Sequence, residues 1–206
     1  MNRRVIVLLS ILIAAILATA GVYVNKIYPA LKKNLMPVQK VINKDNPEKT
    51  IIVYYSYTGN TKKIANKIHN LIGGDIVELE PVTAYSIDYN KVVNQGEKEV
   101  EAKYTPELKT KIDNFSSYDK VILGSPIWWY TMAPPVRAFL QDYDFSGKEI
   151  IPFYTHGGSG SVNSNPEIAK ICPKAKLGSE LSVYHYNLNS SDKEIEQWAR
   201  TNKLIR

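Results

Sequence analysis

From residue 51 onward, short blocks of apolar residues alternate with amphipathic stretches. Blocks rich in β-branched residues are typical of buried strands, whereas apolar residues three and four positions apart are typical of helices. Strands are expected at residues 51–55, 75–80, 120–123, 149–154 and 177–183. Helices are expected at residues 61–72, 106–114, 134–142 and 192–204, with a short one after Pro166. Residues 81–104 are polar without a clear period, and residues 124–132 and 155–163 are expected to form long loops.

This order of elements predicts an α/β fold. Five strands that alternate with helices pair as a parallel sheet, and the crossover helices cover both of its faces. In such sheets a ligand binds beyond the carboxyl ends of the strands, where the strand order reverses. Three loops are therefore expected to converge there, at residues 56–61, 124–133 and 155–163.

The N-terminal residues carry a separate signal. Residues 5–24 contain no charge, and a helix of that length would cross a hydrocarbon layer of about 30 Å. They form either a retained single-pass transmembrane helix or a secretory signal peptide, because Ala18-Thr19-Ala20 has the small-x-small form of a cleavage site. The apolar run continues to Val24, which favours retention. We expect a membrane anchor or signal peptide at 1–24, a basic linker at 25–50 and a folded domain at 51–206.

The charges on the two sides of the apolar run favour opposite orientations of the chain in the membrane. Arg3 and Arg4 favour a cytoplasmic N-terminus, while the lysines that follow between residues 26 and 44 favour the same side for the linker. Large trailing domains cross the membrane regardless of such charges, and this N-terminus has the form of an export signal. We expect a membrane-anchored protein with an extracytoplasmic domain; secretion after cleavage near Ala20 is the alternative.

The net charge of +6 belongs to the N-terminal segment. Residues 1–50 hold eight Lys or Arg and two acids, whereas residues 51–206 hold eighteen of each, so the domain is neutral. It has no basic stripe interleaved with aromatic residues, which argues against nucleic-acid binding. Cys172 is the only cysteine, which excludes an intrachain disulfide, and neither it nor the histidines show metal-ligand spacing.

The first loop, Ser56-Tyr57-Thr58-Gly59-Asn60-Thr61, joins a predicted strand to a predicted helix. A helix N-terminus offers unpaired N–H groups and a partial positive charge, and the hydroxyls add donors. Gly59 lets the backbone curl around an anion. The loop lacks the Gly-x-x-x-x-Gly-Lys of nucleoside triphosphatases and the Gly-x-Gly-x-x-Gly of dinucleotide sites, so a phosphate monoester is the expected ligand. An ordinary capped turn is the alternative.

The second loop places Trp128, Trp129 and Tyr130 side by side, directly after Pro126 and Ile127. Three consecutive aromatic residues in a loop cannot all point inward. A flat conjugated ligand would explain them, since stacked rings gain about 0.5–1.5 kcal/mol beyond area burial. A hydrophobic lid or a partner-binding patch is the alternative.

The third loop begins Thr155-His156-Gly157-Gly158 and continues to Gly160. Its small residues can bring backbone groups close to the edge of a ring; a flexible loop tip is the alternative. A ligand with a phosphate at one end and a flat conjugated ring at the other is flavin mononucleotide, FMN.

The same stretches resemble a known family. Residues 51–204 resemble flavodoxin, and more narrowly a bacterial flavodoxin-like group with a Pro-Ile-Trp-Trp loop and a Thr-His-Gly-Gly-Ser-Gly loop. The matching motifs are Ser56–Thr61, Gly124–Trp129, Ala133–Val136, Tyr143–Lys148 and Thr155–Gly160. The resemblance implies a flavodoxin-like, doubly wound, five-stranded parallel sheet of order 2-1-3-4-5, numbered along the chain. It also implies non-covalent FMN that carries one or two electrons.

By position in these motifs, the resemblance implies three groups of FMN-binding residues. The phosphate would be held by Ser56, Tyr57, Thr58, Gly59, Asn60 and Thr61. The isoalloxazine ring would be flanked by Pro126, Ile127, Trp128, Trp129 and Tyr130. The ring edge would face Thr155, His156, Gly157, Gly158 and Gly160. No catalytic residue is expected, because the flavin carries the chemistry.

Electron transfer from FMN to a redox partner protein or a small-molecule acceptor is the function that the resemblance implies. Flavodoxins often place a glycine beside the flavin N5 and carry an acidic docking face. This chain has Tyr130 at that position and a neutral domain, which leaves a different partner open. An NAD(P)H-dependent FMN or quinone reductase would share the fold. A membrane-anchored binding module without flavin, which uses the aromatic loop for a partner, is the alternative from another class.

Overall fold

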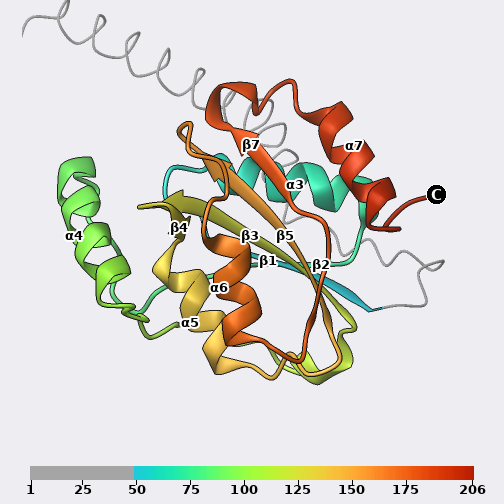
Figure 1. Cartoon of the computed structure of the whole chain (residues 1–206), viewed down its shortest axis with the longest axis horizontal. Coiled ribbons are helices and arrows are strands. Elements are labelled where there is room, and N and C mark those ends of the chain that lie inside the picture. Colours follow the sequence, from blue (N-terminus) through green and yellow to red (C-terminus); the bar gives the residue numbers. More distant parts are fainter. Residues whose placement is uncertain (1–48) are drawn as a thin grey trace, which may run out of the picture. The chain divides into compact units, whose positions relative to one another are not determined.

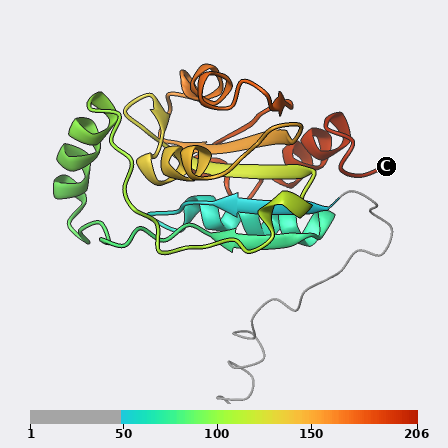
Figure 2. The same ribbon diagram turned by 90° about the horizontal axis from the view of Figure 1, so that it is seen from below.

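A computed structural model of the chain describes residues 49–206, which form a central sheet with helices on both faces (Figures 1 and 2). The strands are β1 (Thr50–Tyr54), β2 (Asp75–Glu78), β3 (Lys120–Trp128), β4 (Thr131–Met132), β5 (Glu149–His156), β6 (Lys176–Leu177) and β7 (Leu181–Tyr184). The helices are α3 (Asn60–Ile72), α4 (Tyr89–Glu101), α5 (Pro134–Asp142), α6 (Ser164–Ile171) and α7 (Asp192–Thr201). Two short 3-10 turns are η2 (Phe115–Ser117) and η3 (His185–Asn187).

The sheet has the order β2-β1-β3-β5-β6, and all of these pairings are parallel. β7 also pairs in parallel with β5, further along that strand. The expected strand at 177–183 is thus two short strands beside the same neighbour. With these two taken as one, the order is the 2-1-3-4-5 that the family resemblance implies. The α/β fold with a five-stranded parallel sheet is therefore confirmed.

Alternate residues of the central strands supply two separate cores. Every residue of β1 is buried. Ile51 and Val53 pack with α5 and α6 on one face, whereas Ile52 and Tyr54 pack with α3 and α7 on the other. A strand buried on both faces is apolar throughout, which is why this run shows no polar alternation.

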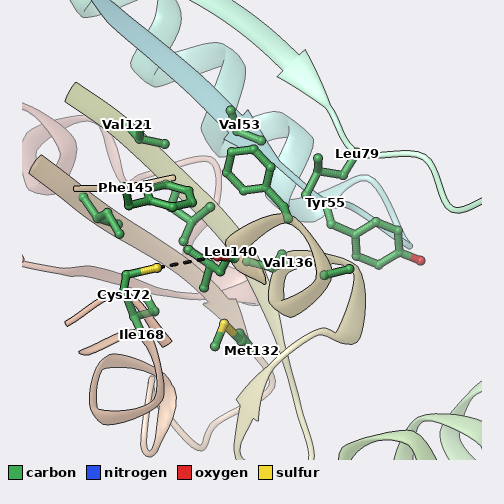
Figure 3. Packing of buried hydrophobic residues seen from close by; sticks show 14 of the residues in the cluster. Val53, Tyr55, Leu79, Val121, Met132, Val136, Leu140, Phe145, Ile168 and Cys172 are labelled. Carbon is green, nitrogen blue, oxygen red and sulfur yellow. Dashed lines mark hydrogen bonds between the residues drawn. The ribbon is translucent and has the colours of Figure 1, made fainter. Parts of the chain in front are cut away.

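Figure 3 shows part of the first core, where Val53 and Val121 of the sheet face Leu140 of α5. The Cys172 thiol lies in the same core and points at the Leu140 carbonyl oxygen, 3.7 Å away. Burial raises the pKa of Cys172 to about 11. This thiol is a packing group rather than a nucleophile at neutral pH.

The third strand is longer than the sequence indicates, which corrects the expected end at residue 123. β3 continues through the Pro126 region to Trp128, and the chain turns at Trp129 and Tyr130 into β4. Pairing with β5 on one side and with β4 at its end gives the extra residues backbone partners. The predicted loop at 124–132 is therefore mostly strand with a tight turn.

The helix expected at residues 106–114 is wrong. This segment runs alongside the chain that follows β2, where Leu108 bridges Pro81. The Lys109 N–H donates to the Glu80 carbonyl at 2.8 Å, and the Val82 N–H donates to Glu107 at 2.9 Å. Pro106 is a good first residue of a helix, but pairing with a neighbouring segment satisfies the backbone here and overrides that local preference.

A helix that the sequence analysis did not predict, α4, lies in the polar stretch before it. Its N-cap, Asp88, accepts hydrogen bonds from the N–H groups of Asn90 and Lys91 at 3.0 and 3.4 Å. Only Val92 and Gly96 are buried along the helix, so its apolar period is short. Both views place α4 beyond the carboxyl ends of the strands, apart from the helices that cover the sheet (Figures 1 and 2).

Two other helices differ from expectation at their ends. α6 begins at Ser164, before Pro166 rather than after it, and α7 ends at Thr201 rather than at 204. Within residues 49–206, no helix is long and apolar enough to cross a membrane. The span expected at residues 5–24 lies outside the described residues.

Candidate functional site

The three loops that the sequence predicts to converge do meet at the carboxyl edge of the sheet. The hydroxyls of Thr61 and Thr155 share a buried hydrogen bond of 2.8 Å, which joins the first loop to the third. The ring of Tyr57 meets the edge of Trp128, with 6.0 Å between ring centroids, which joins the first loop to the second. The Asn163 N–H donates to the Tyr130 carbonyl at 3.1 Å, which joins the second loop to the third.

Within the first loop, Gly59 is the N-cap of α3 and has a φ of 85°, so the last two residues of the loop, Asn60 and Thr61, begin the helix. This left-handed conformation favours glycine, and a Cβ there would meet no atom within 4 Å, so the space beside the loop is open. The Ser56 hydroxyl oxygen accepts from the Lys62 N–H at 3.2 Å, which closes the loop against the first helical turn. Gly59 has no side chain to cap the helix, and the Ser56 hydroxyl accepts from Lys62, so the N–H groups of the residues before Lys62 in α3 can bind an anion and carry a partial positive charge.

The positive charge of Lys62, near the start of α3, is paired with a neighbouring carboxylate. The Lys62 ammonium pairs with the Glu78 carboxylate at 2.7 Å, and Lys62 is half exposed. An anion at the loop would therefore be bound by backbone N–H groups and the hydroxyls of Ser56 and Thr58, rather than by a fixed cation.

The second loop is anchored by Trp128, which stands in a cluster of tyrosine rings. Its ring lies edge-on to Tyr55 at 5.8 Å and to Tyr85 at 5.0 Å between centroids. Burial, followed by a hydrogen bond to the Glu99 carboxylate at 2.6 Å, raises the pKa of Tyr85 above its ordinary value. The tyrosine rings of the cluster are thus neutral, the Glu99 carboxylate lies at its border, and Trp128 is partly buried within it.

Trp129 and Tyr130 form the turn between β3 and β4, and both have positive φ angles, 46° and 67°. The Trp129 indole N–H donates to the Val93 carbonyl of α4 at 3.0 Å. The two side chains remain 41% and 59% exposed. Non-glycine residues held in the left-handed region cost of order 1–3 kcal/mol and cluster at functional sites. The turn is therefore a strained aromatic surface whose shape is fixed by α4 and β3.

Helix α4 packs directly on this turn. A Cβ at Gly96 would lie 3.1 Å from the Trp128 ring, so only glycine lets the helix come this close without displacement. An apolar cavity of about 210 Å³ remains between them, lined by Tyr57, Tyr89, Val92, Val93, Gly96, Ile127, Trp128 and Trp129. A larger cavity of about 990 Å³ lies between α5 and α6 and includes only Trp129 among the predicted site residues. We place the candidate site at the loops, because they carry the convergent polar groups.

The third loop folds around its own histidine. His156 Nδ1 accepts from the backbone N–H groups of Gly158 and Gly160, at 3.0 and 3.2 Å. Burial, and then the neighbouring His185, lower the pKa of His156 below its usual value. The ring is therefore neutral at pH 7.

The structure brings the predicted site residues to one edge of the sheet, and it adds others. Tyr55, Tyr85, Gly96 and Asn163 were missed. Tyr85 and Gly96 belong to the polar stretch, where the one available signal was an N-cap at Asp88 followed by Val92 and Gly96 four residues apart. Within residues 49–206, no three His, Cys, Asp or Glu side chains gather as a metal site would require.

Known proteins resemble this chain in sequence and in fold. Residues 49–202 match the sequence profile of a family described as flavodoxin. A candidate flavoprotein from Bacteroides eggerthii is 28% identical with a TM-score of 0.66, and the match covers 77% of this chain and 99% of that chain. A second one, from Bacteroides uniformis, is 27% identical with a TM-score of 0.67, covering 75% and 99%.

A flavoprotein from Lactobacillus acidophilus, whose structure was solved in complex with FMN, shares the fold. It is 24% identical with a TM-score of 0.58, and the match covers 74% of this chain and 99% of that chain. No curated protein matches the sequence.

Proposed function

This chain belongs to the flavodoxin family, and on that premise we propose that it binds FMN non-covalently and transfers electrons through it. When bound, FMN supplies the redox chemistry, while the protein binds and orients it. The observation that carries the proposal is the meeting of three structures at one sheet edge: a helix N-terminus whose N-cap is a glycine, a strained aromatic turn and a glycine-rich loop. FMN, which joins a phosphate monoester to a flat ring system through a ribityl chain, could contact all three.

The phosphate end would be held by the first loop. The start of α3 behind Gly59, the open space beside Gly59 and the hydroxyls of Ser56 and Thr58 suit a negatively charged phosphate. Asn60 and Thr61 complete the loop, and Thr61 is held in place by its bond to Thr155. These residues fit the group.

The ring end would meet the second and third loops. Trp128, Trp129 and Tyr130 offer apolar faces, and Pro126 and Ile127 continue that surface along β3. Thr155, His156 and the glycines at 157, 158 and 160 offer backbone groups for the ring edge. The 210 Å³ cavity under α4 is smaller than a site that encloses a whole cofactor, so the exposed faces of the loops must complete the site.

A direct titration tests the proposal. The full chain, purified in detergent and stripped of flavin, is titrated with FMN while the FMN fluorescence is recorded. We expect saturable quenching and a shifted flavin absorption spectrum, with riboflavin binding more weakly because it lacks the phosphate. Absence of binding at FMN concentrations up to about 0.1 mM would refute the proposal and favour the flavin-free binding module.

The same preparation separates electron carrier from enzyme. We expect the FMN-loaded chain to accept electrons from an added flavodoxin reductase and to pass them on to an acceptor. Steady oxidation of NADH or NADPH by the loaded chain alone would instead support an NAD(P)H-dependent FMN or quinone reductase. The physiological partner is a redox protein or a small-molecule acceptor that docks on a domain of zero net charge.

We further propose that residues 5–24 anchor the chain in a membrane and that the domain faces away from the cytoplasm. The support is the uncharged run behind Arg3 and Arg4. Resistance of the protein to carbonate extraction, together with its digestion by protease added to intact spheroplasts, is the expected result. Recovery of a soluble chain that begins near Gly21 would show cleavage and secretion instead.

A further inference from the structure

The loop at residues 157–160 is closed by the imidazole of the residue that precedes it. Two backbone N–H groups, of Gly158 and Gly160, converge on His156 Nδ1 at 3.0 and 3.2 Å. The other hydrogen bond inside the described loop is local, from the Ser159 hydroxyl to the Gly160 carbonyl at 3.2 Å. Gly158 and Gly160 have φ angles of 134° and 71°, so no other residue type would follow this path without strain.

These two bonds determine the protonation of the ring. A backbone N–H can only donate, so the ring atom it faces must present a lone pair. A ring turned over by 180° would present a C–H, and a doubly protonated ring would present a third N–H against the two donors. The loop in this form therefore exists only with a neutral His156 whose proton is on Nε2.

The surroundings of the ring favour the same neutral state. Tyr184 of β7 stacks on it, with 5.8 Å between ring centroids, and His185 of η3 follows, packed against Tyr184 at 4.8 Å. Tyr184 and His185 are thus titratable groups beside His156. Burial and the positive charge that His185 can carry both oppose protonation of His156.

We propose that His156 is a positioning residue: its unprotonated Nδ1 holds the 157–160 backbone in the shape that receives the flavin ring edge, so protonation of this ring opens the loop and weakens FMN binding. The loop part of this inference stands on the apoprotein alone. The flavin part rests on the proposed function.

The size of the effect follows from the fraction of neutral rings. If only the neutral form binds, the apparent Kd is the intrinsic Kd divided by that fraction. One pH unit below the pKa of His156 in the flavin-free chain, about one ring in eleven is neutral, so the apparent Kd rises about tenfold. The FMN phosphate also titrates, near pH 6, and a control must separate the two effects.

A matched variant supplies that control. In His156→Asn the side-chain oxygen can accept near the Nδ1 position but does not titrate. We expect the Kd of the full chain in detergent to rise at least about tenfold between pH 7.5 and one unit below the pKa of His156. Over the same pH range, the Kd of the Asn variant should rise less than a third as much as that of the native chain, whatever the affinity of the variant at pH 7.5. His156→Leu, which offers no acceptor, should bind more weakly than the Asn variant at every pH. Equal pH dependence in the native chain and the Asn variant would overturn the inference.

A second measurement does not involve flavin. In the flavin-free chain labelled with ¹⁵N-glycine, the amide resonances of Gly158 and Gly160 should shift together with the titration of His156, below pH 6.5. Gly147, outside this loop, should not follow it. If the Gly158 and Gly160 amide resonances do not shift as His156 titrates, the positioning role is refuted. If the glycine resonances follow the titration of His156 but the chain does not bind FMN, the proposed function is refuted. The effect of His156 on FMN binding is then refuted as well, whereas its role in shaping the loop is supported.

Discussion

Thr61 and Thr155 lie 94 residues apart in the chain, yet their hydroxyls share a buried hydrogen bond of 2.8 Å. Thr61 belongs to the first turn of α3, and Thr155 lies near the carboxyl end of β5. β1 and β5 are not neighbours in the sheet, because β3 lies between them. The bond therefore spans the middle strand at the edge where the strand order reverses, and it holds the predicted phosphate loop against the predicted ring loop.

Removing both hydroxyls should cost less than the sum of the two single removals. Thr61→Val or Thr155→Val leaves the other hydroxyl buried without a partner, which costs about 1–3 kcal/mol of unfolding free energy. The double variant removes both polar groups at nearly constant shape and should lie closer to the native chain than the sum of the singles. Urea unfolding of the flavin-free chain measures all four stabilities. Strictly additive losses would show that the two hydroxyls are not coupled.

Gly96→Ala should not stabilise α4, although alanine normally gains about 0.5–1 kcal/mol over glycine within a helix. The added Cβ would lie 3.1 Å from the Trp128 ring and must displace either the indole or the helix. Asn94→Ala, at an exposed position of the same helix, is the control and should leave stability nearly unchanged or raise it. Tryptophan fluorescence should shift in Gly96→Ala alone. A stabilised Gly96→Ala chain with an unchanged spectrum would contradict the close packing.

Tyr130→Gly should raise the unfolding free energy by about 1 kcal/mol, because the left-handed conformation costs a non-glycine residue about 1–2 kcal/mol and this side chain is mostly exposed. The Tyr130 carbonyl, which accepts from Asn163, is kept. Tyr104→Gly is the control, since Tyr104 is also exposed but does not have a positive φ. That variant should be destabilised. Equal losses in both variants would mean that the turn is not strained at Tyr130.

Thr58→Glu should weaken FMN binding at least about tenfold, because it places a second anion beside the phosphate at an exposed loop position. Thr58→Gln has the same size without the charge and should lose much less. The difference between the two should shrink as salt is added, since exposed charges are screened. Equal affinities of the Glu and Gln variants would place the phosphate elsewhere.

The sequence by itself determined the class of fold, and it predicted where the candidate site lies. Continuous apolar runs such as Ile51–Tyr55, each followed by a helical pattern, have few solutions other than a parallel sheet covered on both faces. Gly59, between a strand and a helix, likewise predicted an anion-binding loop from local chemistry alone. These features depend on neighbours within a few residues, which is why they can be read along the chain.

Only the tertiary structure decided how the ring end of the site is built. α4 has too few buried residues to show a period, and it becomes a wall of the site because Gly96 lets it pack on Trp128. Residues 106–114 do not form the expected helix, because their backbone pairs with the segment that follows β2. The neutral His156, the strained Trp129–Tyr130 turn and the Thr61–Thr155 bond likewise depend on contacts between distant segments or on the folded shape of a loop. Contacts of this kind leave no periodic pattern in the sequence.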